Sequence, residues 1–293
     1  MTHTTPPPAA ILLATDLSAR CDRALSRALQ LARQWEARLV VATVLPPAPP
    51  PQSFLATGPA PDATRLEQRL RRDIGADAEG VALSVRVTEG HVGRALLQLA
   101  AEEGCGLIIT GIASDPAFEL PLLGSTVLWL TRHSPLPLLV VHQRVRGHYR
   151  RLAVATDFSG SSANAANRAL ALFGQPLQLA LVHALETPGS ALLGGDHDTL
   201  LAQAHEQART QARAFLAGLR PLPPPERIRL VIEPGDPAPL LQREAAEAEL
   251  VVVATHGRGA LFELLIGSVA RRLVATLETD TLLVRDQHSR PPL

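Results

Sequence analysis

The chain has 293 residues, of which 46 % are hydrophobic and 19 % charged, so it can build a real core in one large or two ordinary domains. Its 28 basic and 28 acidic residues balance, so neither a nucleic-acid partner nor a membrane partner is expected. All the basic residues are arginine, which excludes mechanisms built on a lysine, and two cysteines without a signal-peptide pattern predict a cytoplasmic protein.

Short apolar runs in the first half predict strands that are buried on both faces. They cover residues 10–15, 38–45, 81–87, 106–111 and 137–142. Helical patterns separate them, and Ser18 is a candidate N-cap for the helix that follows the first strand. Buried strands that alternate with helices indicate a parallel sheet covered on both faces.

The second half repeats this pattern. Its predicted strands cover residues 151–156, 177–184, 228–232, 249–254 and 280–285. Ser159 is a candidate N-cap and Gly174 a candidate C-cap of the helix between the first two of these strands. The fold class is therefore α/β and Rossmann-like, with two tandem five-stranded parallel-sheet domains, residues 1–147 and 148–293, that carry helices on both faces.

The last predicted strand of each domain, 137–142 or 280–285, is expected at the edge of its sheet. Unpaired strand edges recruit partners. We therefore expect the two domains to pair within the chain about a pseudo-two-fold axis, with a homodimer as a further option.

Three features of each domain are expected to meet at the carboxyl ends of the strands, where open α/β sheets bind ligands. An aspartate, Asp16 or Asp157, follows the first strand and can accept hydrogen bonds from a ribose or a base, or cap the next helix. A glycine follows the fourth strand. A Gly-Ser pair, 124–125 or 267–268, then opens a helix whose free N–H groups suit an anion, although ordinary cap chemistry explains it equally well.

The order strand, T-D-apolar-S, helix, and later strand, G-x-x-G, nine residues, G-S, resembles the universal stress protein family over essentially the whole chain. The resemblance implies ATP as the ligand, with or without Mg²⁺. It implies that Asp16 and Asp157 face the base and ribose, and that the backbone at Val44 and Ala184 lies near adenine. The residues that it assigns to the phosphates are Gly257, Gly267, Ser268 and the amide of Val269. In the first domain Gly124 and Ser125 match Gly267 and Ser268, and Gly111 is the first glycine of the motif.

Neither domain keeps the glycine motif whole. Ala254 replaces the first glycine in the second domain, whereas Ser114 replaces the second glycine in the first domain. Because a methyl group is a smaller change than a lost phosphate-facing glycine, we expect ATP in the second domain and weak or absent binding in the first.

Other polar residues allow both a functional and a plain interpretation. Arg258 could neutralise a γ-phosphate and His256 could move a proton, or both could be solvated loop residues. Arg271 and Arg272 are expected to face solvent. The segment 196–205 carries Asp196, His197, Asp198 and His205, but its spacing is more typical of a polar loop that enters a helix. No metal site and no catalytic residue are predicted.

Three functions follow from this pattern. The leading hypothesis is a stress-response regulator that binds an adenine nucleotide without efficient turnover. The second is an enzyme that cleaves ATP or transfers AMP, with Arg258 and His256 as its only candidate groups. The third is a scaffold whose nucleotide sites have decayed.

Overall fold

The computed structural model describes residues 6–18, 21–45, 62–112, 124–174, 177–185, 197–255, 272–273 and 276–285. The elements of the first half are β1 (Ala10–Ala14), α1 (Asp22–Trp35), β2 (Arg38–Leu45), α2 (Ala63–Gly75), β3 (Leu83–Glu89), α3 (Val92–Glu102), β4 (Ile108–Gly111), α4 (Ser125–His133) and β5 (Leu138–Val141). Those of the second half are β6 (Arg151–Ala155), α5 (Gly160–Phe173), β7 (Gln178–Leu185), α6 (His197–Gly218), β8 (Ile228–Pro234), α7 (Pro237–Glu247), β9 (Leu250–Ala254) and β10 (Asp280–Val284).

The strands form one ten-stranded sheet in the order β3-β2-β1-β4-β5-β10-β9-β6-β7-β8. Every neighbouring pair is parallel except β5 and β10, which pair antiparallel, with Leu139 opposite Leu282. The two expected five-stranded parallel sheets are therefore present, but their last strands lie at the centre of a joined sheet and not at free edges.

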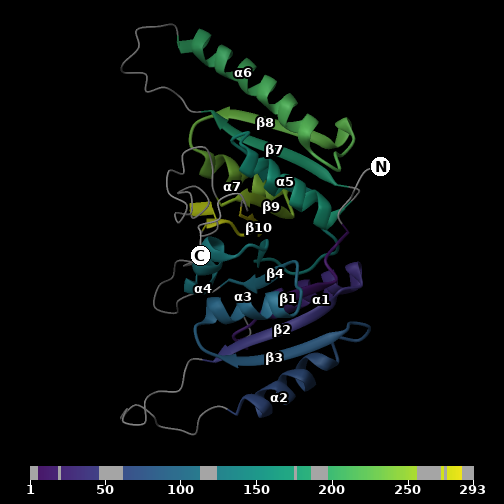
Figure 1. Ribbon diagram of the computed structural model, residues 1–293. Coiled ribbons are helices and arrows are strands. Elements are labelled where there is room, and N and C mark those ends of the chain that lie inside the picture. Colours follow the sequence, from purple (N-terminus) through teal and green to yellow (C-terminus); the bar gives the residue numbers. More distant parts are fainter. Residues whose placement is uncertain are drawn as a thin grey trace, which may run out of the picture.

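Helices cover both faces of this sheet. One face carries α1, α2, α5 and α6, and its buried side chains form one hydrophobic cluster that includes Leu31, Leu70, Leu170 and Phe215. The other face carries α3, α4 and α7, whose buried side chains form a second cluster. Both clusters draw residues from both halves of the chain. The strands of the sheet follow one another along the long direction of the molecule, with α2 and α6 at its opposite ends (Figure 1).

Local sequence signals explain several helix ends. Ser159 caps α5 by accepting a hydrogen bond from the Ser162 N–H, and Gly174 ends that helix with a positive φ of 65°, so both predicted caps are confirmed. The prediction for Ser18 is wrong. The N-cap of α1 is Cys21, whose N–H donates to the carbonyl of Ser18 at 2.9 Å, so Ser18 lies one turn earlier.

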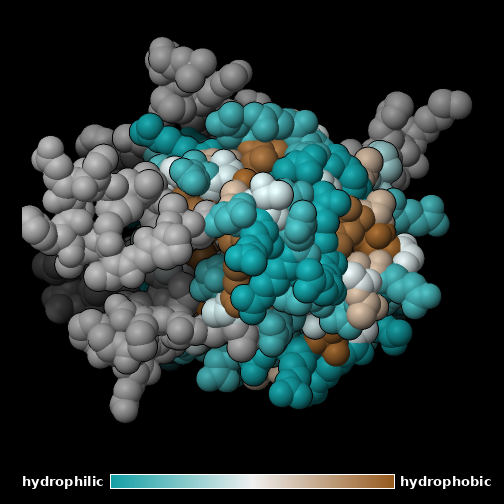
Figure 2. Space-filling model, turned by 90° about the horizontal axis from the view of Figure 1, so that it is seen from below, coloured by the Kyte–Doolittle hydropathy of each residue, from teal (hydrophilic) through white to brown (hydrophobic). Residues whose placement is uncertain are grey.

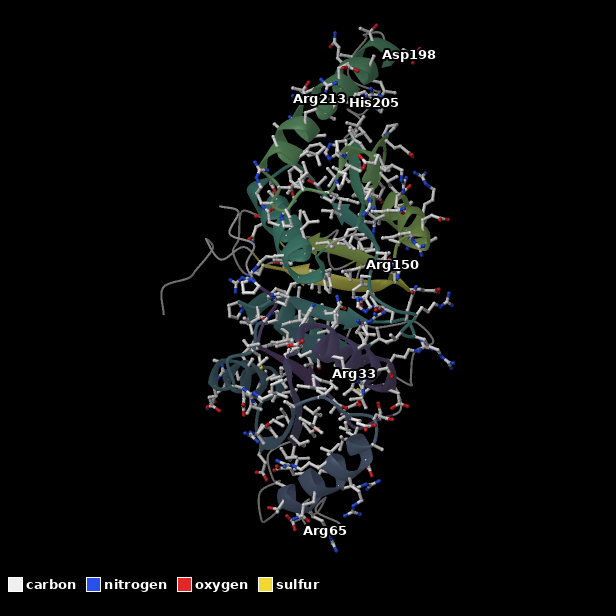
Figure 3. The ribbon with its side chains drawn as sticks, turned by 90° about the vertical axis from the view of Figure 1, so that its right-hand side faces the viewer. Arg33, Arg65, Arg150, Asp198, His205 and Arg213 are labelled. Atoms are coloured by element: carbon white, nitrogen blue, oxygen red, sulfur yellow. The ribbon has the colours of Figure 1, made fainter. Side chains whose placement is uncertain are left out.

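The face of the molecule at the α2 end is mostly hydrophilic (Figure 2). Viewed from the end that carries α2, hydrophobic side chains form small separate patches among hydrophilic ones (Figure 2). Arg65 of α2 and Arg213 of α6 lie at the two ends of the molecule (Figure 3). None of the helices that the structure describes combines the length and hydrophobicity needed to cross a membrane.

Candidate functional site

The strand order creates the same topological switch in each half. In the first half β1 lies between β2 and β4, and in the second half β6 lies between β7 and β9. The chain leaves the first strand on one side and returns on the other. Open α/β sheets bind ligands at such a switch point, beside the carboxyl ends of the strands, and we call this place the crevice. Both predicted aspartates lie here, because Asp16 follows β1 and Asp157 follows β6.

Each aspartate organises the turn that follows its strand. Oδ1 of Asp16 accepts hydrogen bonds from the Ser18 N–H at 2.9 Å and from Sγ of Cys21 at 3.1 Å. Oδ1 of Asp157 accepts one from the Ser159 N–H at 3.0 Å. Partial burial raises the pKa of Asp16, but hydrogen bonds from Ser18 and Cys21 outweigh this effect and hold the pKa below its ordinary value. The first carboxylate is therefore charged at neutral pH.

The residue after each aspartate has a left-handed backbone. Leu17 has a φ of 65° and Phe158 a φ of 59°, a region that branched and bulky residues rarely occupy. In both turns the preceding threonine hydroxyl accepts the N–H of this residue, at 3.1 Å from Thr15 and at 2.9 Å from Thr156. The same strained turn therefore occurs twice, at the crevice. The repeated T-D-apolar-S pattern predicts where the turn lies in the sequence, but it does not predict the left-handed backbone of the apolar residue.

The second half adds two rings to its crevice. Nδ1 of His183, on β7, lies 2.8 Å from the carbonyl oxygen of Thr156, and the His183 ring lies 4.4 Å from the Phe158 ring. In the first half Thr43 takes the place of His183 and donates its hydroxyl to the carbonyl of Thr15 at 3.1 Å. Sequence reasoning missed His183, although it immediately precedes the predicted Ala184.

The remaining predicted site residues fall into two groups. Val44 lies in β2, Ala184 in β7, Gly111 at the end of β4 and Ala254 at the end of β9. Gly124 is the N-cap of α4 and Ser125 its first residue, and the Gly124–Ser125 start carries no side-chain cap. The predicted residues Gly257, Arg258, Gly267, Ser268 and Val269, with His256, lie outside the described residues.

Arg272 is exposed, as the sequence predicts, and its side chain forms an ion pair with Asp236. In the segment 196–205, Asp196 and the side chain of His197 lie outside the described residues, whereas Asp198 and His205 belong to α6. No group of three histidine, cysteine or acidic side chains suitable for a metal ion occurs among the side chains that the structure describes.

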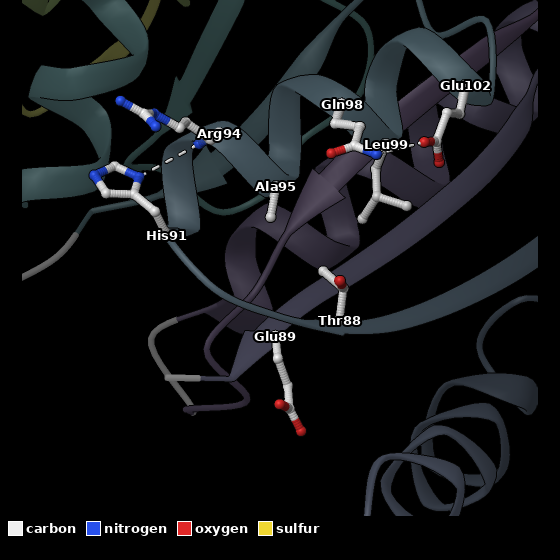
Figure 4. Close-up of a pocket in the computed structure, with 8 residues that line it drawn as sticks. All are labelled: Thr88, Glu89, His91, Arg94, Ala95, Gln98, Leu99 and Glu102. Carbon is white, nitrogen blue, oxygen red and sulfur yellow. Dashed lines mark hydrogen bonds between the residues drawn. The ribbon is translucent and has the colours of Figure 1, made fainter. Parts of the chain in front are cut away.

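Two cavities lie away from the crevice. One, of about 330 Å³, lies beside the end of β3 and the start of α3 and is lined by Thr88, Glu89, His91, Arg94, Ala95, Gln98, Leu99 and Glu102 (Figure 4). Two hydrogen bonds join residues of its lining, since Gln98 donates to Glu102 at 2.8 Å and His91 accepts the backbone N–H of Arg94 at 3.4 Å. The other cavity, of about 340 Å³, separates α6 from β8.

Comparison with known proteins decides the family. The model of the universal stress protein family matches residues 9–142 and again residues 148–285. The chain belongs to the universal stress protein family. A universal stress protein of Mycolicibacterium smegmatis is 27 % identical over 288 residues, which cover 94 % of this chain and 96 % of that relative. Universal stress protein Rv2623 of Mycobacterium tuberculosis is 28 % identical over 61 % of each chain.

Solved structures share the fold. A protein of Pseudomonas aeruginosa described as functionally unknown has a TM-score of 0.70 at 21 % identity, covering 96 % of this chain and 94 % of its own. A universal stress protein from Archaeoglobus fulgidus has a TM-score of 0.63 at 18 % identity, covering 94 % and 96 %. The tandem α/β architecture is therefore that of known universal stress proteins.

Proposed function

We propose that this universal stress protein binds ATP or a related adenine nucleotide, mainly through its second domain, and acts by binding and not by efficient turnover. The observation that carries the proposal is the aspartate turn that is repeated at both switch points of the sheet. There Asp157, in a strained turn, lies at the end of the strand that pairs with β7 and β9. A carboxylate at this place suits a ribose hydroxyl or an amino group of a base.

Differences between the two crevices favour the second domain. Phe158 and His183 offer aromatic surface there, whereas the matching residues of the first domain are Leu17 and Thr43. A ring beside a base contributes stacking that an aliphatic side chain cannot supply. The second domain also retains Gly257 of the predicted phosphate segment, where the first has Ser114.

Binding without turnover is favoured by the chemistry of the side chains around the crevice. Asp157 accepts a hydrogen bond from its own turn, and His183 is held by the carbonyl of Thr156, so both groups are engaged in organising the crevice. An enzyme would need a group aimed at the transferred phosphorus, and Arg258 and His256 are the candidates in the sequence.

Calorimetric titration with Mg-ATP tests the proposal, after removal of any co-purified nucleotide. We expect one site per chain, with affinity reduced at least ten-fold by Asp157→Ala and by Gly267→Val. The matched changes Asp16→Ala and Gly124→Val in the first domain are expected to leave the affinity unchanged.

Each other outcome has a clear meaning. Two sites per chain contradict the preference for the second domain. No binding heat from a nucleotide-free protein contradicts nucleotide binding altogether and favours a scaffold. Sustained ATP loss that His256→Ala abolishes favours the enzyme.

A further inference from the structure

A groove runs between α6 and the edge strand β8 at one end of the sheet. Its helix side is a single stripe of residues spaced three or four apart, and its strand side is formed by Leu230 and Ile232, which together enclose about 340 Å³. The stripe consists of His205, Arg209, Ala212, Arg213 and Leu216. The groove is therefore apolar on its strand side and basic along its helix.

The two domains differ in how far they cover the matching position of their edge strands. Leu83 of β3 lies opposite Leu39, and Ile228 of β8 lies opposite Leu179 at the matching place, so Val85 and Leu230 are equivalent positions. Val85 is 0 % exposed, whereas Leu230 is 37 % exposed.

The covering helices explain the difference. In the first domain Leu66, Leu70 and Ile74 of α2 belong to the hydrophobic cluster that contains Val85. In the second domain α6 presents Ala212 and Arg213 toward β8. A small side chain and a charged one cannot close over Leu230, so the helix leaves a gap that fold geometry alone does not require.

The backbone of β8 is available on the outer side of the sheet. The N–H of Gly235 donates to the carbonyl of Leu185 at 3.1 Å, so the backbone of residue 235 faces β7. Because backbone direction alternates along a strand, the N–H and C=O groups of Ile228, Leu230 and Ile232 face outward. In the part of the chain that the structure describes, no strand pairs with them.

The charged side chains of α6 beside the groove indicate which kind of ligand the groove can bind. Arg209 and Arg213 are exposed on α6, and His205 is half-buried one turn before Arg209. Arg209 meets Glu206 only at 4.0 Å, and Arg213 forms no ion pair with any residue that the structure describes. Arg213 and His205 lie on the same helix near this end of the molecule (Figure 3).

We propose that this groove binds an extended peptide segment of a partner protein that carries both acidic and apolar side chains. The segment adds as a further strand on β8, through hydrogen bonds to Ile228, Leu230 and Ile232. On the face of this strand that meets α6, apolar side chains pack on Leu230, Ile232 and Leu216, and carboxylates two or four residues away pair with Arg209 and Arg213. The proposal is independent of the nucleotide site.

Fluorescence anisotropy on the full chain tests it with a fluorescein-labelled peptide of sequence Thr-Val-Thr-Glu-Thr-Leu-Thr-Glu, in which the valine, the leucine and both glutamates lie on one face of an extended strand. We expect saturable binding that the double change Arg209→Glu with Arg213→Glu weakens at least ten-fold. Leu230→Asp is expected to weaken it similarly. The matched double change Arg65→Glu with Arg69→Glu, on exposed residues of α2 at the opposite edge, is expected to leave binding unchanged. A peptide with alternate backbone amides N-methylated is expected to bind at least ten-fold more weakly, because it cannot pair with β8.

Four results would overturn the proposal. The first is absence of saturable binding, and the second is an equal loss of peptide binding in the α2 control variant. The third is undiminished binding of the N-methylated peptide together with displacement of the peptide by dodecanoate. The fourth is dimerisation of the chain through β8. The third result would assign the groove to an acyl anion. The last would be seen as a dimer in sedimentation velocity that Leu230→Asp converts to a monomer, and it would assign the edge to a second copy of the chain.

Discussion

At the scale of single residues, Asp280 at the start of β10 links the two halves of the chain. Its fully buried carboxylate accepts hydrogen bonds from the N–H groups of His142 and Gln143, both at 2.8 Å, and from the Tyr149 hydroxyl at 2.5 Å. Arg27 of α1 supplies the opposite charge at 3.5 Å, and its guanidinium lies 4.1 Å from the Tyr149 ring centre. A buried charge with this many partners is stable only while all of them remain.

We expect Asp280→Asn to destabilise the protein by about 3–5 kcal/mol, because it leaves the buried Arg27 without its counter-charge. An amide also cannot accept the bonds from His142, Gln143 and Tyr149 together. The free energy of unfolding in urea measures the loss. Asp236→Asn breaks an exposed ion pair with Arg272 and is the matched control, expected to change stability little. Equal effects of the two changes would contradict the role of burial.

Tyr149 makes this network visible to spectroscopy, because it is the only tyrosine in the chain. Burial first, and then the charge of Asp280, raise the pKa of its hydroxyl well above the ordinary value. The unfolded chain ionises near pH 10, whereas the folded chain resists ionisation, so stability is full below about pH 10 and falls as the pH rises above it.

We therefore expect the phenolate absorbance of the folded protein to appear only well above pH 10, together with loss of ellipticity. Tyr149→Phe is expected to cost about 1.5–3 kcal/mol at neutral pH, since it removes a hydrogen bond to a charged group, and to flatten this alkaline decline. Ionisation near pH 10 with the ellipticity intact would contradict the buried hydroxyl.

Sequence reasoning reached some of these residues and not others. Asp16 and Asp157 could be found because the pattern around them occurs twice. The positive φ of Phe158, its contact with His183 and the partners of Asp280 could not be found, since each depends on which distant segments the sheet brings together. Whether Asp16 and Asp157 hold a nucleotide stays a prediction.

At the scale of elements, the two halves differ in the contact that the N-cap residue of α3 or α7 makes. His91 caps α3, and its ring lies 5.2 Å from Trp129 of α4. At the matching place Asp236 caps α7 and forms an ion pair with Arg272. The first half therefore has an aromatic contact at the place where the second half has an ion pair. The aromatic contact needs space for the Trp129 ring beside α3, and the absence of a side chain at Gly93 leaves that space.

We expect Gly93→Ala to destabilise the protein by about 1–3 kcal/mol, because overpacking forces neighbours to move. A Cβ at residue 93 would lie 2.1 Å from Cε3 of Trp129. The free energy of unfolding in urea measures the effect. Gly75→Ala, also in a helix but with no atom within 4 Å of the added carbon, is the control and is expected to be neutral or to stabilise by up to about 1 kcal/mol. An unchanged stability for Gly93→Ala would show that Trp129 does not pack on α3 in solution.

The elements themselves were largely predictable. Apolar runs gave all ten described strands with ends that differ by no more than two residues, because a strand buried on both faces must be apolar throughout. The match of β3 was weaker, with residues 81–87 predicted and Leu83–Glu89 observed. It is an edge strand, and polar side chains such as Thr88 and Glu89 are tolerated there.

At the scale of the whole molecule, the two halves share one sheet and both of its hydrophobic faces. Leu139 and Leu282 lie opposite each other where the halves meet, and Trp35 of α1 lies 5.9 Å from Phe173 of α5 on one face. The sequence indicated that both final strands need a partner. It could not give the register of their pairing, because a register between segments so far apart depends on tertiary packing.

A shared core implies that neither half unfolds alone. Both tryptophans, Trp35 and Trp129, belong to the first half, so fluorescence reports that half while far-UV circular dichroism reports both. We expect the urea midpoints of the two signals to coincide, as for one cooperative unit. Leu139→Asp places a charge in the fully buried centre of the sheet and is expected to separate the two midpoints or to prevent folding, whereas Leu200→Asp on an exposed part of α6 is expected to leave them together. Separate midpoints in the unmodified protein would mean that β5 and β10 join two independent domains, and the pairing would then be an interface and not a core.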